Sequence, residues 1–531
     1  MEYVVEEFTP AERAVLTRYV TNLDRPVFAL RNLPEVVKGA LFARYSRSPK
    51  SLRRLLLDEF ADDLDARGTA EVGEARRAER LYERIFYDYG DDSVAQLGGA
   101  HVAVEQASNL LTKVLEWGRL AAYLEQSTRY IPYDDKPGGR YRYYRDPGIA
   151  ASRHARAYTE TLDAVFDTYA ALLPKVRTWC EQRFPRPDDA SERVYRNSIT
   201  AKTCDILRGL LPAATVSNVG IFASGQAYES LLLRLRSHEL AEARAVGDTL
   251  LAELREVIPA FLTRVDRPDR GEVWADYLAD SRAATRAVAE ELVGQVQPRE
   301  AAEVELVAYA PDAELELVTG MLYPHSHLPE AQLRDLVADM STEERRRVVR
   351  AYVGERRNRR HKPGRALERI SYRFDVCSDY GAFRDLQRHR MLTIDWQELS
   401  PRHGYDVPDE VVDAGAEDAW HTALGRQAAL WERLVDEHPR QAQYAVGFAY
   451  KLRYSMQLNA RAALQMLELR TTPQGHPSYR RVCQRMHRLI AEEAGHPAVA
   501  DMMRFVDHGA SELERLDAER ATEARRQRLG S

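Results

Sequence analysis

Cysteine is scarce in this sequence, and its spacing excludes two classes of protein. Only four cysteines occur among 531 residues, with no C-x-x-C pair and no short spacing between any two. This pattern excludes a zinc ribbon and argues against a small disulfide-rich scaffold. His476 and His487 also lack the spacing of metal ligands with other histidines, so the sequence predicts no metal site. The cysteines are Cys180, Cys204, Cys377 and Cys483.

Long apolar runs are missing as well. Residues 1–7 contain neither the basic segment nor the apolar segment of a secretory signal. The longest apolar stretch, residues 210–223, is interrupted by Pro212 and Gly220 and is too short to span a bilayer. We therefore expect a cytoplasmic protein with no membrane association.

Lysine is rare, whereas arginine is abundant. The sequence has eight lysines and 68 arginines, yet its net charge is −6 and its pI about 6.2. This balance argues against a generic polyanion binder, so a nucleic-acid partner is not expected. Arginine suits bidentate recognition of phosphate and carboxylate, but a GC-rich genome also produces an arginine excess, so only clustered arginines are informative. The length corresponds to about two to four domains at roughly 150 residues each.

Periodicity predicts a helix-rich α+β protein. Residues 370–376 alternate apolar and polar positions, as a half-buried strand does. Apolar residues recur at helical spacing in two long segments, and the charged C-terminus is predicted as a helix or a frayed tail. The predicted helices are 232–257, 446–469 and 511–529, and the predicted strands are 3–5, 100–104, 304–309 and 370–376. The polar stretch 264–298 contains the best candidate for a linker, and parts of it are compatible with helix.

An internal repeat divides the chain into two halves. The motif E-x-S-x-R occurs at Glu125–Ser127–Arg129 and again at Glu398–Ser400–Arg402. Each copy follows an apolar stretch that ends in an arginine, at Arg119 and at Arg390. Each half also has a Leu-Arg followed ten residues later by another arginine, at positions 234 and 244 and at positions 470 and 480. We interpret this order as a tandem duplication, with repeats at 1–270 and 299–531 and a linker at 271–298.

Three groups of residues are candidates for chemistry. Arg388-His389-Arg390 places two guanidinium groups around an imidazole, which suits two anionic or carbonyl groups of a ligand; the alternative is a solvated basic patch. The E-x-S-x-R side chains of the second half would face one way in an extended loop, as a nucleotide site requires; the alternative is a loop with an internal Glu–Arg pair. Asn459 and Arg470 would share one face of a helix, which is equally typical of a surface helix.

These motifs resemble those of the flavin-dependent thymidylate synthases (ThyX). The signature of that family is R-H-R, seven residues, a Ser and then x-R-Y, with a Glu two residues before the Ser. Asn459-Ala460-Arg461 and Leu469-Arg470 are similar to its downstream N-A-R and L-R motifs, and Glu368-Arg369 stands where the family has an E-H pair. In the first half, residues 90–93, 211–212 and 242–244 are similar to its G-H-x-S, L-P and E-I-R segments.

The resemblance implies a reaction and assigns the residues that would perform it. The reaction is reductive methylation of dUMP or a related uridine nucleotide, using FAD, NADPH and methylenetetrahydrofolate. The implied catalytic residues are Arg388, Ser127 and Arg470. The implied nucleotide ligands are Glu125, Ser127, Arg129, Arg388, Arg470, Glu398, Ser400, Arg402 and Arg234. The implied cofactor ligands are His389, Arg390, Asn459, Arg461 and Glu368.

The resemblance also implies an assembly. The family is a homotetramer whose sites form where subunits meet, so a homodimer of this duplicated chain would imitate that tetramer. One class of site would combine the R-H-R of the second half with the E-x-S-x-R loop of the first. The complementary class, with Trp117, Arg119 and Arg234, has an indole in place of one basic arm and is expected to be degenerate.

Several positions depart from the family pattern. R-H-R is replaced by Trp117-Gly118-Arg119 in the first half, nine residues separate Arg390 from Ser400, and His403 replaces the expected Tyr. Asp385 stands where a Gln is expected. Two further functions therefore stay open: a flavin- or nucleotide-binding pseudoenzyme, and an RNA-uridine-modifying or nucleic-acid-binding protein. Only the Tyr- and Arg-rich segment 140–145 favours the last.

Overall fold

The computed structural model describes residues 6–46, 48–65, 96–510 and the single positions 513, 516, 517, 520 and 523. The predicted strand 3–5, residues 90–93 and most of the segment 511–529 lie outside these residues. The chain forms two compact units. Unit 1 comprises Met1–Glu105, Gly118–Glu125 and Asn218–Val296, and unit 2 comprises Gln106–Trp117, Gln126–Ser217 and Gln297–Ser531. Unit 2 therefore contains parts of both sequence halves.

Unit 1 begins with three short helices. These are α1 (Pro10–Tyr19), α2 (Glu35–Tyr45) and α3 (Leu52–Asp65), of which α3 packs against the other two. Thr9 starts α1 through a capping box with Glu12, because each residue's side chain accepts from the other's backbone N–H. Leu16, Leu55 and Leu56 are fully buried and form part of its core.

A three-stranded sheet carries the rest of unit 1. Its strands are β1 (Gly99–Ser108), β2 (Ala121–Glu125) and β3 (Val216–Ser224), in the order β1-β3-β2, with β2 antiparallel to β3. β1 contains the strand predicted at 100–104. Three helices follow: α9 (Gly225–Arg236), α10 (Ala241–Arg255) and α11 (Gly271–Val293). Most of the stretch predicted as a linker is therefore helix α11.

The prediction of one continuous helix over 232–257 is wrong, because the chain breaks between α9 and α10. Arg244 stabilises the break, since its Nη1 donates to the backbone carbonyls of His238 and Glu239 at 2.6 and 2.9 Å. A side chain of the second helix thus satisfies the carbonyl groups that a helix end leaves exposed.

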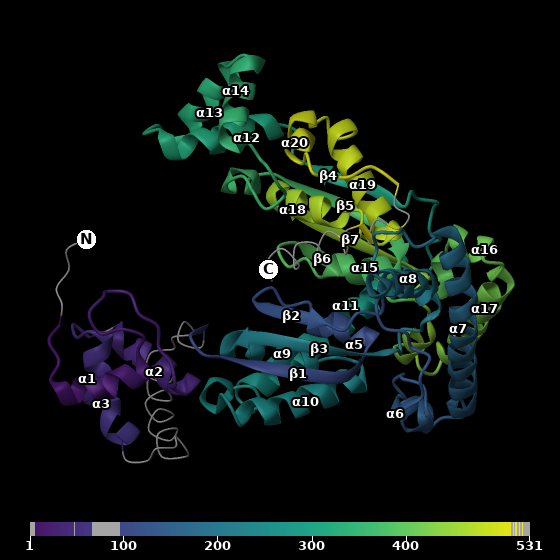
Figure 1. Cartoon of the computed structure of the whole chain (residues 1–531), viewed down its shortest axis with the longest axis horizontal. Helices are drawn as coiled ribbons and strands as arrows, with labels where there is room; N and C mark the ends of the chain where they lie inside the picture. Colours follow the sequence, from purple (N-terminus) through teal and green to yellow (C-terminus); the bar gives the residue numbers. More distant parts are fainter. Residues whose placement is uncertain are drawn as a thin grey trace. The chain divides into compact units, whose positions relative to one another are not determined.

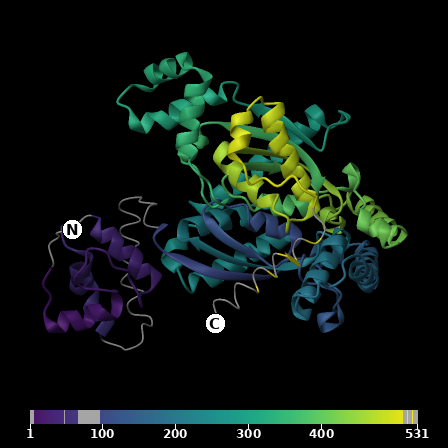
Figure 2. The same cartoon turned by 45° about the horizontal axis from the view of Figure 1, so that its top comes forward.

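Unit 2 contains a four-stranded antiparallel sheet. Its strands are β4 (Val304–Tyr309), β5 (Ser371–Asp379), β6 (Thr393–Trp396) and β7 (Lys451–Asn459), in the order β4-β5-β7-β6. Tyr372, Phe374 and Val376 are fully buried on one face of β5, which confirms the alternating strand predicted there. Figure 2 shows α19 (Pro477–Glu492), in yellow, lying across this sheet, where it contacts β4 and β5.

The helix predicted at 446–469 is wrong in its first half, where the chain forms β7 before α18 (Ala460–Arg470). Leu452, Tyr454, Met456 and Leu458 are buried at alternating positions, which is the period of a strand rather than of a helix. Asn459 marks the change, because its Oδ1 accepts from the Ala462 N–H at 2.8 Å and caps α18.

Further helices complete unit 2. The long helix α7 packs against α8 and α17, and α12 contacts α13 and α14 in a small separate core around Val318, Leu333 and Val337. Their bounds are α5 Asn109–Leu115, α6 Pro147–Ala150, α7 Ala155–Arg183, α8 Glu192–Leu207, α12 Ala313–Leu322, α13 Glu330–Asp339, α14 Thr342–Val353, α15 Tyr380–Gln387, α16 Asp409–Asp413, α17 Glu417–Leu434 and α20 Pro497–Met502. No helix within the described ranges combines the length and the apolar composition that crossing a bilayer requires.

The two sequence halves repeat one order of elements (Figure 1). The first half runs β1, α5, β2 and later β3, α9, α10, and the second runs β5, α15, β6 and later β7, α18, α19. In both sheets the third of these strands lies between the other two. The fold is therefore helix-rich α+β with one small sheet in each half, as predicted.

A buried ion pair in unit 2 provides a stability test. Arg356 is 2% exposed and donates to the two carboxylate oxygens of Glu468 at 2.7 and 2.6 Å. Glu468→Gln leaves the guanidinium uncompensated and should lower the free energy of unfolding by about 3–5 kcal/mol. Glu343→Gln is the matched control at an exposed pair with Arg350 and should leave the free energy of unfolding almost unchanged, because solvent screens the pair. Urea denaturation followed by circular dichroism measures both, and equal effects would refute a structural role for the buried pair.

Candidate functional site

Four arginines surround one carboxylate inside unit 2. Arg208 Nη1 lies 3.2 Å from Asp385 Oδ2, and Arg470 Nη1 lies 3.8 Å from Asp385 Oδ1. Burial alone would raise the pKa of Asp385, but the charges of Arg208, Arg388, Arg470 and Arg129 hold that pKa far below its ordinary value. We call these five residues the arginine cluster. It joins Arg129 and Arg208 of the first half to Arg388 and Arg470 of the second.

Arg129 is fixed by groups from both sequence halves. Its guanidinium makes a bidentate pair with Asp205 of α8, at 2.7 Å from Nε and 2.8 Å from Nη2. Nη1 donates to Tyr479 Oη at 2.9 Å, and Nη2 donates to the carbonyl of Gln474 at 3.1 Å. Ser127 Oγ accepts from the Arg129 N–H at 3.2 Å and shapes the loop. The E-x-S-x-R loop of the first half is therefore held against the α18–α19 connection of the second.

The R-H-R segment follows α15 directly. Arg388 is the C-cap of that helix, and Arg470 is the last residue of α18. Arg470 Nε donates to His389 Nε2 at 2.8 Å. Burial, and then the charge of Arg470, lower the pKa of His389 to about 3. The imidazole is consequently neutral near pH 7, with Nε2 as an acceptor, while Arg390 is exposed.

The other predicted cofactor ligands make contacts within the protein. Asn459 and Arg470 do not lie within one helix as predicted, because Asn459 ends β7 and caps α18, whereas Arg470 is the last residue of α18. Arg461 Nη1 lies 3.2 Å from Glu368 Oε1, and Arg461 Nε donates to the carbonyl of Pro363 at 3.1 Å. Arg461 and Glu368 thus form a pair that joins the start of α18 to the segment before β5.

The residues predicted for the complementary site are divided between the two units. In unit 2, Glu398 pairs with Arg440, the guanidinium of Arg402 lies 5.3 Å from the Trp431 ring centre, and Ser400 Oγ accepts from the Arg402 N–H at 3.4 Å. Glu398 and Arg402 therefore contact residues outside the loop, and the internal Glu–Arg pair of the alternative is not what these contacts show. Trp117, 45% exposed, meets Trp396 edge to face at 6.1 Å.

The remaining predicted members of that site belong to unit 1. Burial lowers the pKa of Arg234, and a Cβ built on Gly118 would lie 3.6 Å from Arg234 Nη2. Arg119 follows Gly118 and is exposed. Glu125, which was predicted for the first class of site with Ser127 and Arg129, also belongs to unit 1 and is buried at the end of β2. Glycine at the middle position of the altered R-H-R motif leaves room for the Tyr123 hydroxyl, which a Cβ there would meet at 2.6 Å.

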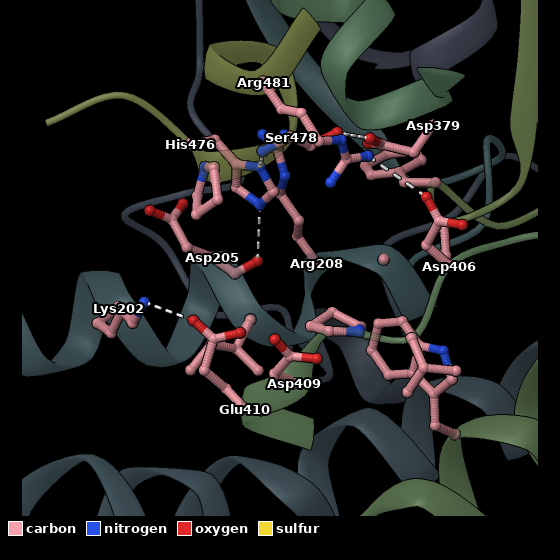
Figure 3. Close-up of a pocket in the computed structure, with 18 residues that line it drawn as sticks. Lys202, Asp205, Arg208, Asp379, Asp406, Asp409, Glu410, His476, Ser478 and Arg481 are labelled. Atoms are coloured by element: carbon pink, nitrogen blue, oxygen red, sulfur yellow. Dashed lines mark hydrogen bonds and ion pairs between the residues drawn. The ribbon is translucent and has the colours of Figure 1, made fainter. Parts of the chain in front are cut away.

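A pocket of about 240 Å³ borders the arginine cluster (Figure 3). Arg208, a member of the arginine cluster, and Asp205, the partner of Arg129, both line the pocket. His476 Nε2 lies 3.3 Å from the Asp205 carbonyl, and burial lowers the pKa of His476 well below its ordinary range. Asp379, the cap of α15, accepts from the Ala382 N–H at 2.8 Å, and burial raises its pKa. Apolar side chains such as Trp420 and Phe448 line the pocket together with charged ones, and the pocket adjoins the cluster at Arg208.

Some of these residues escaped sequence reasoning. Arg208 and Asp205 were not predicted, because their partners lie 177 and 76 residues away in the chain. Lys362 was also missed, although its charge contributes to the lowered pKa of His389. It lies in an arginine-rich stretch, residues 345–365, whose density of basic residues was a usable signal.

The Tyr- and Arg-rich segment 140–145 is largely structural. Tyr141 and Tyr143 are 4% and 3% exposed, and their hydroxyls donate to Asp167 and Asp163 at 2.6 and 3.0 Å. Buried rings are not available to stack on bases, which removes the feature that favoured nucleic-acid binding. Among the described residues, no group of three or more His, Cys, Asp or Glu has the arrangement of a metal site.

His389 predicts a dependence of stability on pH. Its pKa of about 3 in the folded protein lies below its ordinary value of 6.5, so between these values the unfolded chain binds a proton that the folded chain does not. The stability from the buried neutral imidazole is complete above about pH 6.5 and is lost as the pH falls toward 3.

His389→Gln should reduce proton uptake on unfolding near pH 5 by roughly one proton per chain. The slope of unfolding free energy against pH measures this uptake, and His325→Gln, at an exposed position, is the control. An unchanged slope in the His389 variant would show that its imidazole is not buried in neutral form.

Comparison with known proteins identifies the family. The family model described as "Thymidylate synthase complementing protein" (Thy1) matches residues 40–260 and 305–496. UPF0159 proteins of Chlamydia pneumoniae and Chlamydia muridarum are 39% and 38% identical, each over 97% of this chain and 98% of the relative. A UPF0159 protein of Thermoplasma acidophilum is 31% identical over 91% of this chain and 97% of its own. With family motifs in both halves and the family model matched in two segments, the chain belongs to the Thy1 (ThyX) family in a tandem arrangement.

Proposed function

We propose that this protein is a flavin-dependent thymidylate synthase-like enzyme that methylates dUMP or a related uridine nucleotide. The observation that carries the proposal is the arginine cluster. Arg470 of the L-R motif lies 3.8 Å from Asp385, and the charges of Arg129 in the E-x-S-x-R loop and of Arg388 in R-H-R act on the same carboxylate. A nucleotide monophosphate with a polar pyrimidine ring suits several converging guanidinium groups.

The residues have distinct roles in this proposal. Arg129, Arg388 and Arg470 bind the phosphate and a pyrimidine carbonyl through charge-assisted hydrogen bonds. A guanidinium at that carbonyl also stabilises the negative charge that develops on the ring, as an oxyanion hole does. Ser127 orients the nucleotide and does not attack it. The buried cysteines are not nucleophiles, because burial raises the pKa of Cys180 to about 11 and of Cys483 to about 12.

The residues beside the cluster fit FAD. His389 presents a neutral ring next to Arg470, Arg390 is exposed, and Lys362 is near enough to influence the imidazole. Guanidinium and ammonium groups suit a pyrophosphate, and a neutral imidazole suits the flavin ring. When bound, FAD would supply hydride transfer, with NADPH as the reductant and methylenetetrahydrofolate as the source of carbon. Asn459, Arg461 and Glu368 support this region through the cap and the ion pair of α18.

The assembly proposed is a homodimer that imitates a tetramer of single-copy subunits. The support is the repeated order of elements in the two halves, each with its own small sheet. The two kinds of site are expected to differ, because Trp117-Gly118-Arg119 replaces R-H-R in the first half. Two competent sites per dimer are proposed, each built on the arginine cluster.

Flavin binding and turnover test the proposal. Purified protein incubated with excess FAD and desalted should keep flavin absorption bands, and reduced enzyme should be reoxidised only when dUMP and methylenetetrahydrofolate are present. Arg388→Ala should lower turnover roughly 100-fold or more, because it removes charge stabilisation at the ring. Arg350→Ala, on the exposed face of α14, is the control and should retain activity. A colourless wild-type protein after this treatment would refute the proposal.

A flavin- or nucleotide-binding pseudoenzyme is the second candidate. Arg129 pairs with Asp205 and Arg470 with His389, so these two guanidinium groups already have partners within the protein. Retained flavin together with the absence of turnover for wild type would favour it.

Nucleotide affinity tests the role of Arg129. The Arg129 side chain is 12% exposed, so Arg129→Ala should weaken dUMP binding by roughly 2–5 kcal/mol. The double variant Arg129→Ala, Asp205→Asn removes the carboxylate that the single change leaves unpaired, and it should recover thermal stability without recovering affinity. Isothermal titration calorimetry and thermal unfolding measure the two quantities. Equal dUMP affinity in wild type and Arg129→Ala would contradict the assignment.

A further inference from the structure

The arginine cluster contains its own anion. Asp385 lies on α15 and is 8% exposed. Its two carboxylate oxygens face different guanidinium groups, with Arg208 Nη1 at 3.2 Å and Arg470 Nη1 at 3.8 Å. The phosphate of a nucleotide would use the same guanidinium groups, so the carboxylate already occupies part of the positive field that a phosphate needs.

We propose that Asp385 is a specificity-determining residue, an internal anion that competes with the phosphate of an incoming nucleotide. The inference rests on the proposed function only in treating the arginine cluster as the nucleotide site. It concerns ligand binding alone, so its test does not depend on whether the protein catalyses the reaction.

The balance of charge in the cluster supports this role. Four guanidinium groups are matched by Asp385 and by Asp205, which pairs with Arg129. A side chain of the same shape without charge, such as Asn, or the longer uncharged Gln, would leave the field of three arginines uncompensated. Because Asp385 is buried, its charge is poorly screened by solvent and acts at full strength on its neighbours.

Arg208 shows that the cluster keeps donor capacity for a ligand. Arg208 is 3% exposed, and one of its groups, Nη2, is buried without a hydrogen bond to any described residue. A Cβ built on Gly381 would lie 3.1 Å from this atom, so glycine at that position leaves space beside the donor. Arg208 also lines the neighbouring pocket. Arg208 thus donates to Asp385 with one group, while its Nη2 lies toward the neighbouring pocket, whose lining also includes Asp379.

The ligand class follows from this competition. With Asp385 in place, a phosphate dianion gains less from the cluster than it would from four arginines alone. The wild-type site should therefore prefer dUMP over deoxyuridine, which lacks the phosphate, by less than the same site would without the Asp385 charge. Removing the carboxylate charge should shift the preference strongly toward the phosphorylated ligand.

Binding of inorganic phosphate, dUMP and deoxyuridine to the flavin-loaded full-length protein tests the inference. Asp385→Gln should bind phosphate and dUMP at least about tenfold more tightly than wild type at low salt, and this gain should shrink at high salt. Its affinity for deoxyuridine should stay within about twofold of wild type. Asp385→Glu keeps the charge and should bind all three as wild type does.

The control for a general change of net charge is Asp375→Asn. Asp375 pairs with Arg453 on the neighbouring strand at 2.7 Å, away from the cluster. This variant changes net charge equally and should leave phosphate affinity unaltered. Equal gains in Asp375→Asn and Asp385→Gln, or no gain in Asp385→Gln, would overturn the inference. If Asp385→Gln fails to fold, Asp385→Asn takes its place with the same expectation and the same contrary results.

Discussion

The site depends on one constraint, which is that several guanidinium groups cannot be buried together without carboxylates between them. Arg129, Arg208, Arg388 and Arg470 converge within unit 2, and Asp385 and Asp205 supply the compensating charge. Like charges in a region of low dielectric repel strongly, and a buried unpaired charge costs several kcal/mol. The carboxylates therefore let the protein keep an anion-binding arrangement in the folded, ligand-free state. A ligand must in turn compete with these internal partners.

The two sequence halves meet around this cluster through backbone and side-chain contacts inside unit 2. The Leu211-Pro212 segment of the first half pairs with 444–448 of the second, with the Ala213 N–H donating to the Val446 carbonyl at 2.8 Å. Tyr380 Oη donates to the Asn109 carbonyl at 2.7 Å, which joins α15 to α5. Because the two repeats are covalently linked, the first repeat of a chain contacts the second repeat of the same chain. Each half can then keep some motifs and lose others, as Trp117-Gly118-Arg119 illustrates.

The spacing of apolar residues along the sequence predicted the elements whose residues alternate clearly between buried and exposed positions. The strand around Tyr372 and Phe374 and the strand 304–309 followed from apolar alternation, and the tandem arrangement followed from repeated motifs. The helix predicted at 446–469 failed because Leu452 to Leu458 alternate with period two, which helical neighbours in α18 obscured. The break between α9 and α10 depends on the side chain of Arg244, which no periodicity reveals. Arg208 and Asp205 could not be found because an ion pair between residues far apart in sequence leaves no local signal.

The most direct test of the account is whether Arg129 and Arg388 serve one site from a single chain. Arg129→Ala and Arg388→Ala chains with different tags would be co-expressed, the mixed assemblies isolated, and dUMP sites of wild-type affinity counted by calorimetry. The structure places both residues around Asp385 of the same chain, so every chain in the mixture is defective and no such site should appear. Recovery of wild-type sites at about half of the wild-type number, as sites shared between the two chains of a mixed dimer would give, would contradict the account.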